Sequence, residues 1–364
     1  MESPDSNKRN RTDGYDLIKS LKHIPQRIPF LGKPTSSTVS IAIPISILAN
    51  CQTEELRAYV VGNIARTCAI FGIAEIVLFN DFESLSENEL KRYKNKPHMQ
   101  PHSLMNYFTL ILEYLETPQY LRRSIFDYEK DLKFAGLLNP LDAPHHMRAN
   151  EWLPFRQGIL LPGYSMEGGS VDCGLPVPVL VDNVKDYFNV KLSRKEKKKV
   201  NIENVKGGQV IEDHKSNRVT VQLDIKSLSL CAKLKYTDGQ CQEEVQFSGK
   251  IVPNSLPTTL MGLYWGYTVR QCQTFEEIFT SVNYEYDLVI GTSEHGEVIS
   301  GQFKLPKFEH LLIVFGGLKG LEVVIDKPEK KFKYYINICE HQHSRTIRTE
   351  EAIMICLARL YPFV

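Results

Sequence analysis

Three segments of unusual, polar sequence stand at the ends of apolar, strand-like runs, and the first two of them contain glycine. They are residues 291–296 (GTSEHG), 315–322 (FGGLKGLE) and 337–351 (NICEHQHSRTIRTEE). Glycine has no Cβ, so the backbone can approach a ligand closely and adopt positive φ, as a planar, neutral group such as adenine requires. Gly316-Gly317 alone is more typical of a tight turn than of a ligand loop. The occurrence of three such segments therefore favours a ligand site.

Motifs for several other chemistries are not met. Phe315 stands where a GxGxxG dinucleotide motif needs its first glycine, and the same segment does not fit GxxxxGK[ST]. The eight cysteines include no CxxC pair, which leaves a zinc ribbon or a CxxC redox site unsupported. His341 and His343 have no third ligand at a suitable spacing, so a solvated loop is the better interpretation. We expect no metal.

Positive charge is concentrated in two regions, although the whole chain is nearly neutral. Lysine and arginine number 44 against 43 acidic residues, yet residues 1–35 and 191–199 are strongly basic. The second region contains Arg194, Lys195, Lys197, Lys198 and Lys199. Such a run is usually a solvated loop, but small β-barrels commonly bind nucleic acid along one face through phosphate contacts. The basic run is therefore equally compatible with two interpretations, an RNA-binding segment and a solvated loop.

The elements that would position these three segments alternate between strands and helices. In the first part of the chain a strand is predicted at 38–43, a helix from the N-cap Thr53 to Gly72, and a buried strand at 74–79. A polar loop then leads to a helix at 105–116. After Pro257 we expect strands at 262–270, 286–290, 311–315 and 333–338, and helices at 274–280 and 349–360. This alternation is typical of a parallel α/β sheet.

The middle of the chain has a different texture, with short β-type runs and no long amphipathic helix. The runs are 157–161, 177–181, 217–224 and 244–252. They favour a small barrel or sandwich. Neither flanking half has enough strands for a covered sheet, so we predict one α/β domain interrupted by an all-β insertion. The expected divisions are a basic flexible tail at 1–35, α/β parts at 36–147 and 258–364, and the insertion at 148–257.

The expected setting is the interior of a cell. The N-terminus is polar and charged, unlike a secretory signal peptide. No run of roughly 18 apolar residues is present, so no membrane span is predicted. Scattered cysteines are most simply interpreted as free thiols in a reducing compartment.

Six stretches resemble the eukaryotic and archaeal branch of the SPOUT superfamily of RNA methyltransferases. They are 70–79, 134–147, 262–270, 286–296, 314–322 and 344–353, and they span nearly the whole chain from residue 38 onward. The resemblance implies a SPOUT-type α/β fold with a C-terminal trefoil knot, interrupted by an OB-like barrel. It further implies S-adenosylmethionine as cofactor, an RNA substrate, expected to be ribosomal, and a homodimer with the active site at the subunit interface. Residence in the nucleus, and in the nucleolus, is expected from the family and the basic tail.

By position, the resemblance implies a cofactor pocket formed by Thr292, His295, Gly316, Asn337 and Ile338. Relatives often have arginine in place of His295 and threonine in place of Ile338. Arginine is permanently charged and presents five donors, whereas neutral histidine presents one. The implied alternative is a catalytically weak or inactive factor that binds RNA or protein in ribosome assembly or at the mitotic apparatus. An unrelated nucleotide-binding enzyme is disfavoured by the unmet phosphate motifs.

The reaction expected from the resemblance is methylation of an RNA base, with uridine N3 as the leading target. Because sulfonium is an excellent leaving group, the enzyme would mostly supply position and desolvation. N3 must also lose its proton, or its developing anion must be stabilised. Arg270 is the candidate for the second role, although an ion pair or a phosphate contact is equally compatible. No general base is identified.

Overall fold

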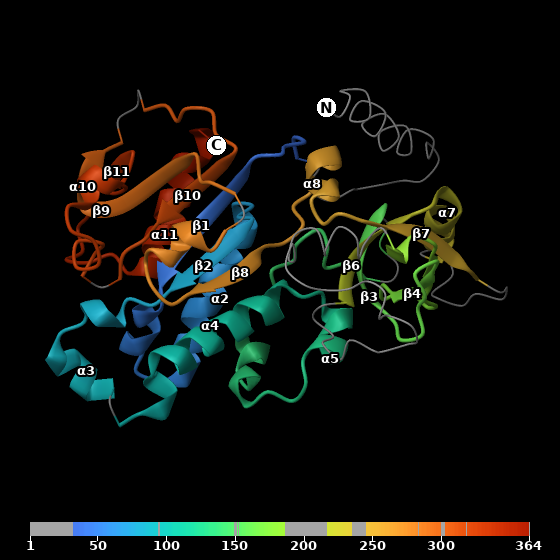
Figure 1. Ribbon diagram of the computed structural model, residues 1–364, viewed down its shortest axis with the longest axis horizontal. Coiled ribbons are helices and arrows are strands. Elements are labelled where there is room, and N and C mark those ends of the chain that lie inside the picture. The colour runs from blue at the N-terminus through green and yellow to red at the C-terminus, as the bar shows by residue number, and fades with distance from the viewer. Residues whose placement is uncertain are drawn as a thin grey trace. The chain divides into compact units, whose positions relative to one another are not determined.

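The computed structural model describes residues 32–93, 95–148, 151, 153–185, 217–234, 245–282, 284–299, 303–317 and 319–363. These residues form two compact units (Figure 1). An α/β unit comprises residues 37–116, 128–141 and 266 onward. A barrel unit comprises 117–127, 142–265 and the described residues before 37. Each unit is described by itself.

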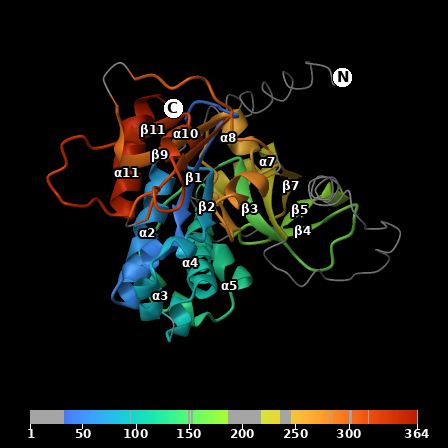
Figure 2. The ribbon, with the colours of Figure 1, turned by 60° about the vertical axis from the view of Figure 1, so that its left-hand side comes forward.

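The α/β unit is built on a six-stranded sheet in the order β11-β9-β10-β1-β2-β8, with every neighbouring pair parallel. The predicted parallel sheet is therefore confirmed. Its strands come from both sides of the barrel in sequence, and Figures 1 and 2 show β1 beside β2 and β10. The strands are β1 (Thr38–Pro44), β2 (Glu75–Phe79), β8 (Thr268–Cys272), β9 (Leu288–Val298), β10 (His310–Val314) and β11 (Tyr334–Asn337).

Apolar side chains are buried on both faces of this sheet. Ala42, Val77 and Val314 are paired in register and belong to one core cluster. Their neighbours in sequence, such as Ile41 and Ile313, point to the other face and are also fully buried. Continuous apolar strands are typical of parallel sheets covered on both sides.

Helix α2 packs against both α4 and α11, and α4 also lies against strands β2 and β8. Thr53 caps α2 as predicted, because its side chain accepts a hydrogen bond from the backbone N–H of Leu56. Two expectations were wrong: α4 begins at Pro101, a favoured first helical residue, and α3 occupies part of the predicted polar loop. Good helix formers such as Glu87 explain α3. The helices are α2 (Glu54–Ile70), α3 (Glu87–Tyr93), α4 (Pro101–Glu116), α9 (Glu277–Thr280), α10 (Pro328–Lys331) and α11 (Thr349–Leu360).

Two predicted strand boundaries differ from those observed. The strand expected at 262–270 begins only at Thr268, because Gly262 adopts φ +66° at the end of helix α8 (Leu256–Met261). The strand expected at 286–290 is β9, which continues to Val298. Short 3₁₀ helices complete the secondary structure: Ile45–Asn50, Phe82–Ser84, Pro97–Met99, Gln119–Leu121, Lys130–Leu132, Ala135–Leu137 and Tyr361–Phe363.

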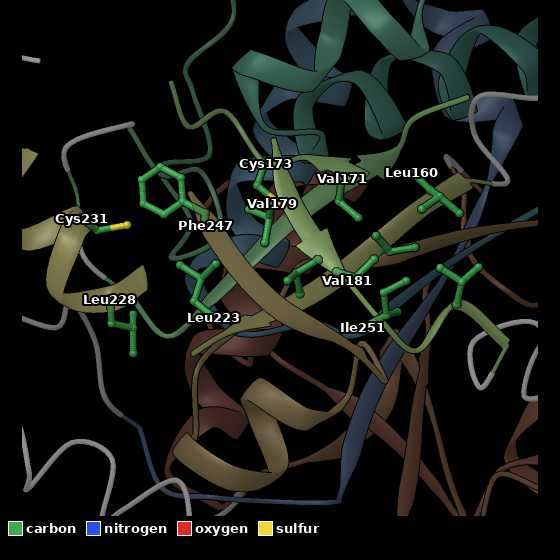
Figure 3. Close-up of a cluster of buried hydrophobic side chains, with 13 residues drawn as sticks. Leu160, Val171, Cys173, Val179, Val181, Leu223, Leu228, Cys231, Phe247 and Ile251 are labelled. Atoms are coloured by element: carbon green, nitrogen blue, oxygen red, sulfur yellow. The ribbon is translucent and has the colours of Figure 1, made fainter. Parts of the chain in front are cut away.

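The barrel unit confirms the predicted all-β region as a closed barrel in the order β3-β4-β5-β7-β6. Figure 3 shows its core, in which Val171, Val179 and Phe247 are fully buried. The sequence missed β4 and helix α7. The elements are β3 (Phe155–Leu160), β4 (Gly169–Asp172), β5 (Val179–Val181), β6 (Arg218–Leu223), β7 (Phe247–Val252), α5 (Arg122–Ile125) and α7 (Ile225–Leu234). The OB-like class and the knot stay predictions of the resemblance.

Gly158 provides a test of barrel packing. A Cβ at this buried position of β3 would lie 2.7 Å from both the Asp172 carbonyl oxygen and Cys173 Sγ. We expect Gly158→Ala to lower the free energy of unfolding by about 1–3 kcal/mol, since overpacking displaces neighbouring atoms. Urea unfolding followed by tryptophan fluorescence measures this, because Trp265 packs 6.1 Å from the Phe155 ring. Gly136→Ala is the control, because a Cβ there meets nothing within 4 Å. Equal stability of the two variants would contradict this packing.

Candidate functional site

The three segments singled out in the sequence (291–296, 315–322 and 337–351, called the glycine segments after the first two) lie at one edge of the sheet. The first segment lies within β9, and the other two begin at the ends of β10 and β11. These strands are neighbours in the order β11-β9-β10 and run parallel. Carboxyl ends of parallel strands share an edge, and ligands bind at this edge in open α/β sheets. The topology therefore assembles segments that are separate in sequence into one candidate site.

The first segment leaves the sheet as a bulge within β9. Gly291 pairs with Tyr335 of β11, whereas the next residue of β11, Ile336, pairs with Glu297. Residues 292–296 are therefore outside the β11 ladder. The bulge is tied to the end of β10 by the buried hydroxyl of Thr292, which donates to the Val314 carbonyl at 3.1 Å.

The second segment forms a tight turn. The N–H of Gly320 donates to the carbonyl of Gly317 at 3.0 Å, and Gly320 has φ +77°. A Cβ on Gly316 would lie 2.5 Å from the Gly320 carbonyl carbon. The hydroxyl of Thr349, at the start of α11, donates to the Gly316 carbonyl at 3.0 Å. The turn interpretation of Gly316-Gly317 is therefore correct, and the turn also lies at the candidate site.

The third segment is joined to the first by an asparagine side chain. Asn337 Nδ2 donates to the Glu294 carbonyl at 2.7 Å, while Asn337 Oδ1 accepts from the Cys339 N–H at 2.9 Å. Ile338 is 8% exposed and follows directly. His295 differs from these residues because 74% of its side chain is exposed. Four of the five cofactor residues implied by the resemblance are thus held in place, and His295 projects into solvent. Their role in cofactor binding stays a prediction.

A carboxylate that was not anticipated from the sequence lies where these segments meet. Glu322 Oε1 accepts from Ser293 Oγ at 2.5 Å and from the Tyr335 hydroxyl at 2.7 Å. Ser293 belongs to the bulge, Glu322 follows the turn, and Tyr335 lies in β11 just before Asn337. Partial burial alone would raise the pKa of Glu322, but the hydrogen bonds from Ser293 and Tyr335 lower it below its usual value. Glu322 ends the second glycine segment, and this position could have singled it out.

A second unanticipated carboxylate supports the turn from behind. Asp81 follows β2 at the same edge and accepts from the Ser46 N–H at 3.1 Å and the Ser46 Oγ at 2.5 Å. Burial raises the pKa of Asp81 above its usual value. A Cβ on Gly317 would lie 3.3 Å from Asp81 Oδ2, so the turn packs closely against this buried group.

Arg270 lies at the opposite, amino-terminal edge of the sheet. Its Nε forms an ion pair with Glu75 Oε1 at 2.8 Å, and its guanidinium also donates to the Tyr286 hydroxyl at 2.8 Å and the Ile278 carbonyl at 3.2 Å. Glu75 begins β2, and Tyr286 precedes β9. These contacts favour the ion-pair interpretation of Arg270 over contact with the glycine segments. A catalytic role stays a prediction.

The charge state of Glu75 is set by this network. Burial alone would raise the pKa of Glu75, but hydrogen bonds from Arg270 and Tyr286 lower it below the usual range. Burial and the negative charge of Glu75 raise the pKa of Tyr286. Tyr284 also donates to Glu75 Oε2, at 3.1 Å. The carboxylate is therefore ionised and has partners on both oxygens.

The remaining expectations concern RNA and metals. Arg194, Lys195, Lys197, Lys198 and Lys199 lie outside the described residues. Within the described ranges, no group of three or more His, Cys, Asp or Glu residues could hold a metal ion. His341 and His343 are both exposed. No helix in the part of the chain that the structure describes has the length and apolar character of a membrane span.

Comparison with known proteins gives one family and several named relatives. The model of a family described as "Putative RNA methyltransferase" matches residues 38–360. A mouse protein named 28S rRNA (uridine-N(3))-methyltransferase is 40% identical over 342 residues, which cover 89% of this chain and 76% of the mouse protein. The human protein of that name is 40% identical over 338 residues, which cover 89% of this chain and 78% of the human protein. The Drosophila melanogaster protein of that name is 39% identical over 348 residues, which cover 90% of this chain and 62% of the Drosophila protein.

The Glu75–Arg270 pair predicts a specific stability defect. Arg270→Met should lower the free energy of unfolding by about 3–5 kcal/mol at pH 7, because it leaves a buried charge unpaired. The double variant Glu75→Gln/Arg270→Met should lose less free energy of unfolding than the sum of the losses in the two single variants. Urea unfolding followed by circular dichroism measures these effects.

The same pair predicts a pH dependence. Because the folded-state pKa of Glu75 is lowered, the stabilisation is complete above the unfolded-state pKa of about 4.3 and is lost as pH falls through the lower folded-state value. The difference in free energy of unfolding between wild type and Arg270→Met should therefore become smaller as the pH is lowered. A difference that stays constant from pH 7 to pH 3 would contradict the assignment.

Proposed function

The chain belongs to this RNA methyltransferase family, and on that premise we propose that it methylates a base of ribosomal RNA, with uridine N3 as the target. The observation that carries the proposal is the 40% identity, over most of both chains, to proteins named as 28S rRNA uridine-N3 methyltransferases. The methyl donor proposed with this class is S-adenosylmethionine. We propose nuclear and nucleolar residence, as expected for an enzyme that acts on ribosomal RNA.

The carboxyl edge of the sheet is the proposed cofactor site, and its glycine turn fits such a ligand. A Cβ at Gly316 would lie 2.5 Å from the Gly320 carbonyl carbon, so the turn packs backbone against backbone here and only glycine fits. Its peptide groups would meet the planar ring of the cofactor. Thr292, His295, Asn337 and Ile338 would complete the site. When bound, S-adenosylmethionine would supply a methyl group on a good leaving group. The protein would hold the cofactor, orient the base and exclude water.

Removal of the N3 proton makes a further demand on the protein. Arg270 remains the candidate from the sequence for stabilising the developing anion. In its own subunit, however, it is bound to Glu75 and Tyr286 at the far edge of the sheet. Such a role would require this network to open when RNA binds, or contact with the site of a second subunit.

A homodimer is part of the proposal, and an exposed apolar surface supports it. Leu56, Tyr59 and Ile70 recur along one stripe of α2 and are 48%, 56% and 52% exposed. Met354 and Tyr361 lie on α11 and directly after it, and both are exposed, while α11 contacts α2. A second copy covering this surface would remove it from water. The SPOUT knot is proposed from the resemblance alone.

The alternative function is a factor of the same fold that binds RNA or protein but methylates poorly or not at all. The exposed His295 favours this alternative, because 74% of its side chain is exposed and the polar partner described for it, Glu294 Oε1 at 3.7 Å, belongs to its own segment. Cofactor binding separates the two functions.

The proposed activity predicts a defined product. The protein, incubated with labelled S-adenosylmethionine and an unmodified large-subunit rRNA transcript, should yield labelled 3-methyluridine on nucleoside analysis. Gly316→Ala should abolish this product and weaken cofactor binding at least tenfold in calorimetry, because the added Cβ distorts the turn. Gly136→Ala is the matched control and should be unaffected. No binding of S-adenosylmethionine by the wild-type protein at millimolar concentration would exclude the enzyme and leave the binding factor.

The basic run predicts a salt-dependent contribution to RNA binding. Changing Lys197, Lys198 and Lys199 to glutamate should weaken binding and reduce the slope of log affinity against log salt by about 2–3. Filter binding at several salt concentrations measures both quantities. The same change at the exposed Lys304, Lys307 and Lys330 is the control for charge. If neither affinity nor slope changes, the run is only a solvated loop.

A further inference from the structure

Glu322 is the acidic side chain that links the glycine segments. Through one oxygen, Oε1, it is bonded to the bulge by Ser293 and to β11 by Tyr335. Its own position is two residues beyond Gly320, where the tight turn ends. A Cβ on Gly320 would overlap Glu322 Oε2, so this second oxygen lies against the backbone of the turn.

The two oxygens of Glu322 are in different situations. Oε1 accepts two hydrogen bonds, which fix the orientation of the carboxylate. No described hydrogen bond joins Oε2 to another residue, although the backbone N–H of Glu322 itself also favours the ionised carboxylate, and the residue is exposed to solvent. Both donors to Oε1 are neutral hydroxyl groups, so they leave the negative charge in place, and the lowered pKa keeps the group ionised at neutral pH. The result is an oriented acceptor with one oxygen available.

Asp81 differs from Glu322 in that its carboxylate is buried and both of its oxygens already have donors. It lies at the same edge, but both of its oxygens accept from Ser46 and it is only 5% exposed. Its carboxyl group is committed to the protein interior. Of these two carboxylates, only Glu322 can accept a hydrogen bond from a ligand that rests on the glycine turn.

We propose that Glu322 binds a ribose hydroxyl of the adenosine cofactor, with Ser293 and Tyr335 as positioning residues. The inference rests on the proposed function. A neutral ring would contact the turn backbone, and the adjoining sugar would then meet Oε2 beside Gly320. Ionised carboxylates accept from ribose hydroxyls in dinucleotide-binding sheets for the same reason, since a charged acceptor forms a stronger hydrogen bond than a neutral one. The ammonium group of the methionine portion is the competing ligand for this carboxylate.

Calorimetry with three probes distinguishes these ligands. S-adenosylhomocysteine carries adenosine and an amino-acid portion, 5′-methylthioadenosine lacks the amino-acid portion, and 2′,3′-dideoxyadenosine lacks both ribose hydroxyls. The proteins are wild type, Glu322→Gln, Tyr335→Phe and the control Glu309→Gln. Glu309 is an exposed carboxylate directly before β10, at the opposite edge of the sheet.

We expect Glu322→Gln to weaken the binding of S-adenosylhomocysteine and of 5′-methylthioadenosine by the same factor, about tenfold or more. The dideoxy probe should bind wild type and Glu322→Gln equally. Tyr335→Phe should show a smaller loss with the same dependence on the hydroxyls, which a general disturbance of the fold would not produce. Glu309→Gln should match wild type throughout.

Two results would overturn the inference without affecting the proposed function. One is unchanged binding of 5′-methylthioadenosine by Glu322→Gln. The other is a loss confined to S-adenosylhomocysteine, which would assign Glu322 to the ammonium group. If wild type binds none of the adenosine probes, both the inference and the proposed function fail.

Discussion

The ion pair between Glu75 and Arg270 joins residues that are 195 positions apart in the sequence. It lies across β2 and β8, so it links the part of the chain before the barrel to the part after it. Burial of both charges is tolerable only because each has close partners, including the hydroxyls of Tyr284 and Tyr286. The pair therefore holds β8 beside β2 in the sheet that continues through β1 to β10, β9 and β11, and so joins the two halves of the α/β unit.

The sequence was most informative where one residue pattern has one physical cause. Thr53 and the spacing of apolar residues in α2 specify a helix through local capping and amphipathic packing, and the end of α11 at Leu360 was predicted correctly. Boundaries that depend on tertiary contacts were less accessible. The extension of β9 past Gly291 cannot be inferred locally, because it depends on renewed pairing of Glu297 with Ile336. Helix α3 was missed because its polar residues carry no apolar stripe.

The candidate site was partly predictable for the same reasons. Glycines at the ends of apolar runs located the first two segments, and a polar run after a predicted strand located the third. The hydroxyl and carboxylate contacts among them were not predictable, since Ser293, Glu322 and Tyr335 become neighbours only through the sheet order. Arg270 could be singled out from the sequence, but its partners could not, because Glu75 is 195 positions away and directs the side chain to the amino-terminal edge of the sheet. Its catalytic role stays a prediction.

The insertion of the barrel between β2 and β8 also bears on how the protein is made. During synthesis at roughly 5–20 residues per second, β1 and β2 leave the ribosome on the order of ten seconds or more before β8 and β10 exist to pair with them. Throughout that interval, two strands with apolar residues on both faces have unpaired edges. The barrel can form in the meantime from strands that are closer together in sequence. Nascent chains of this protein should therefore depend on chaperones most strongly after β2 has emerged, and the dependence should end when β10 is complete.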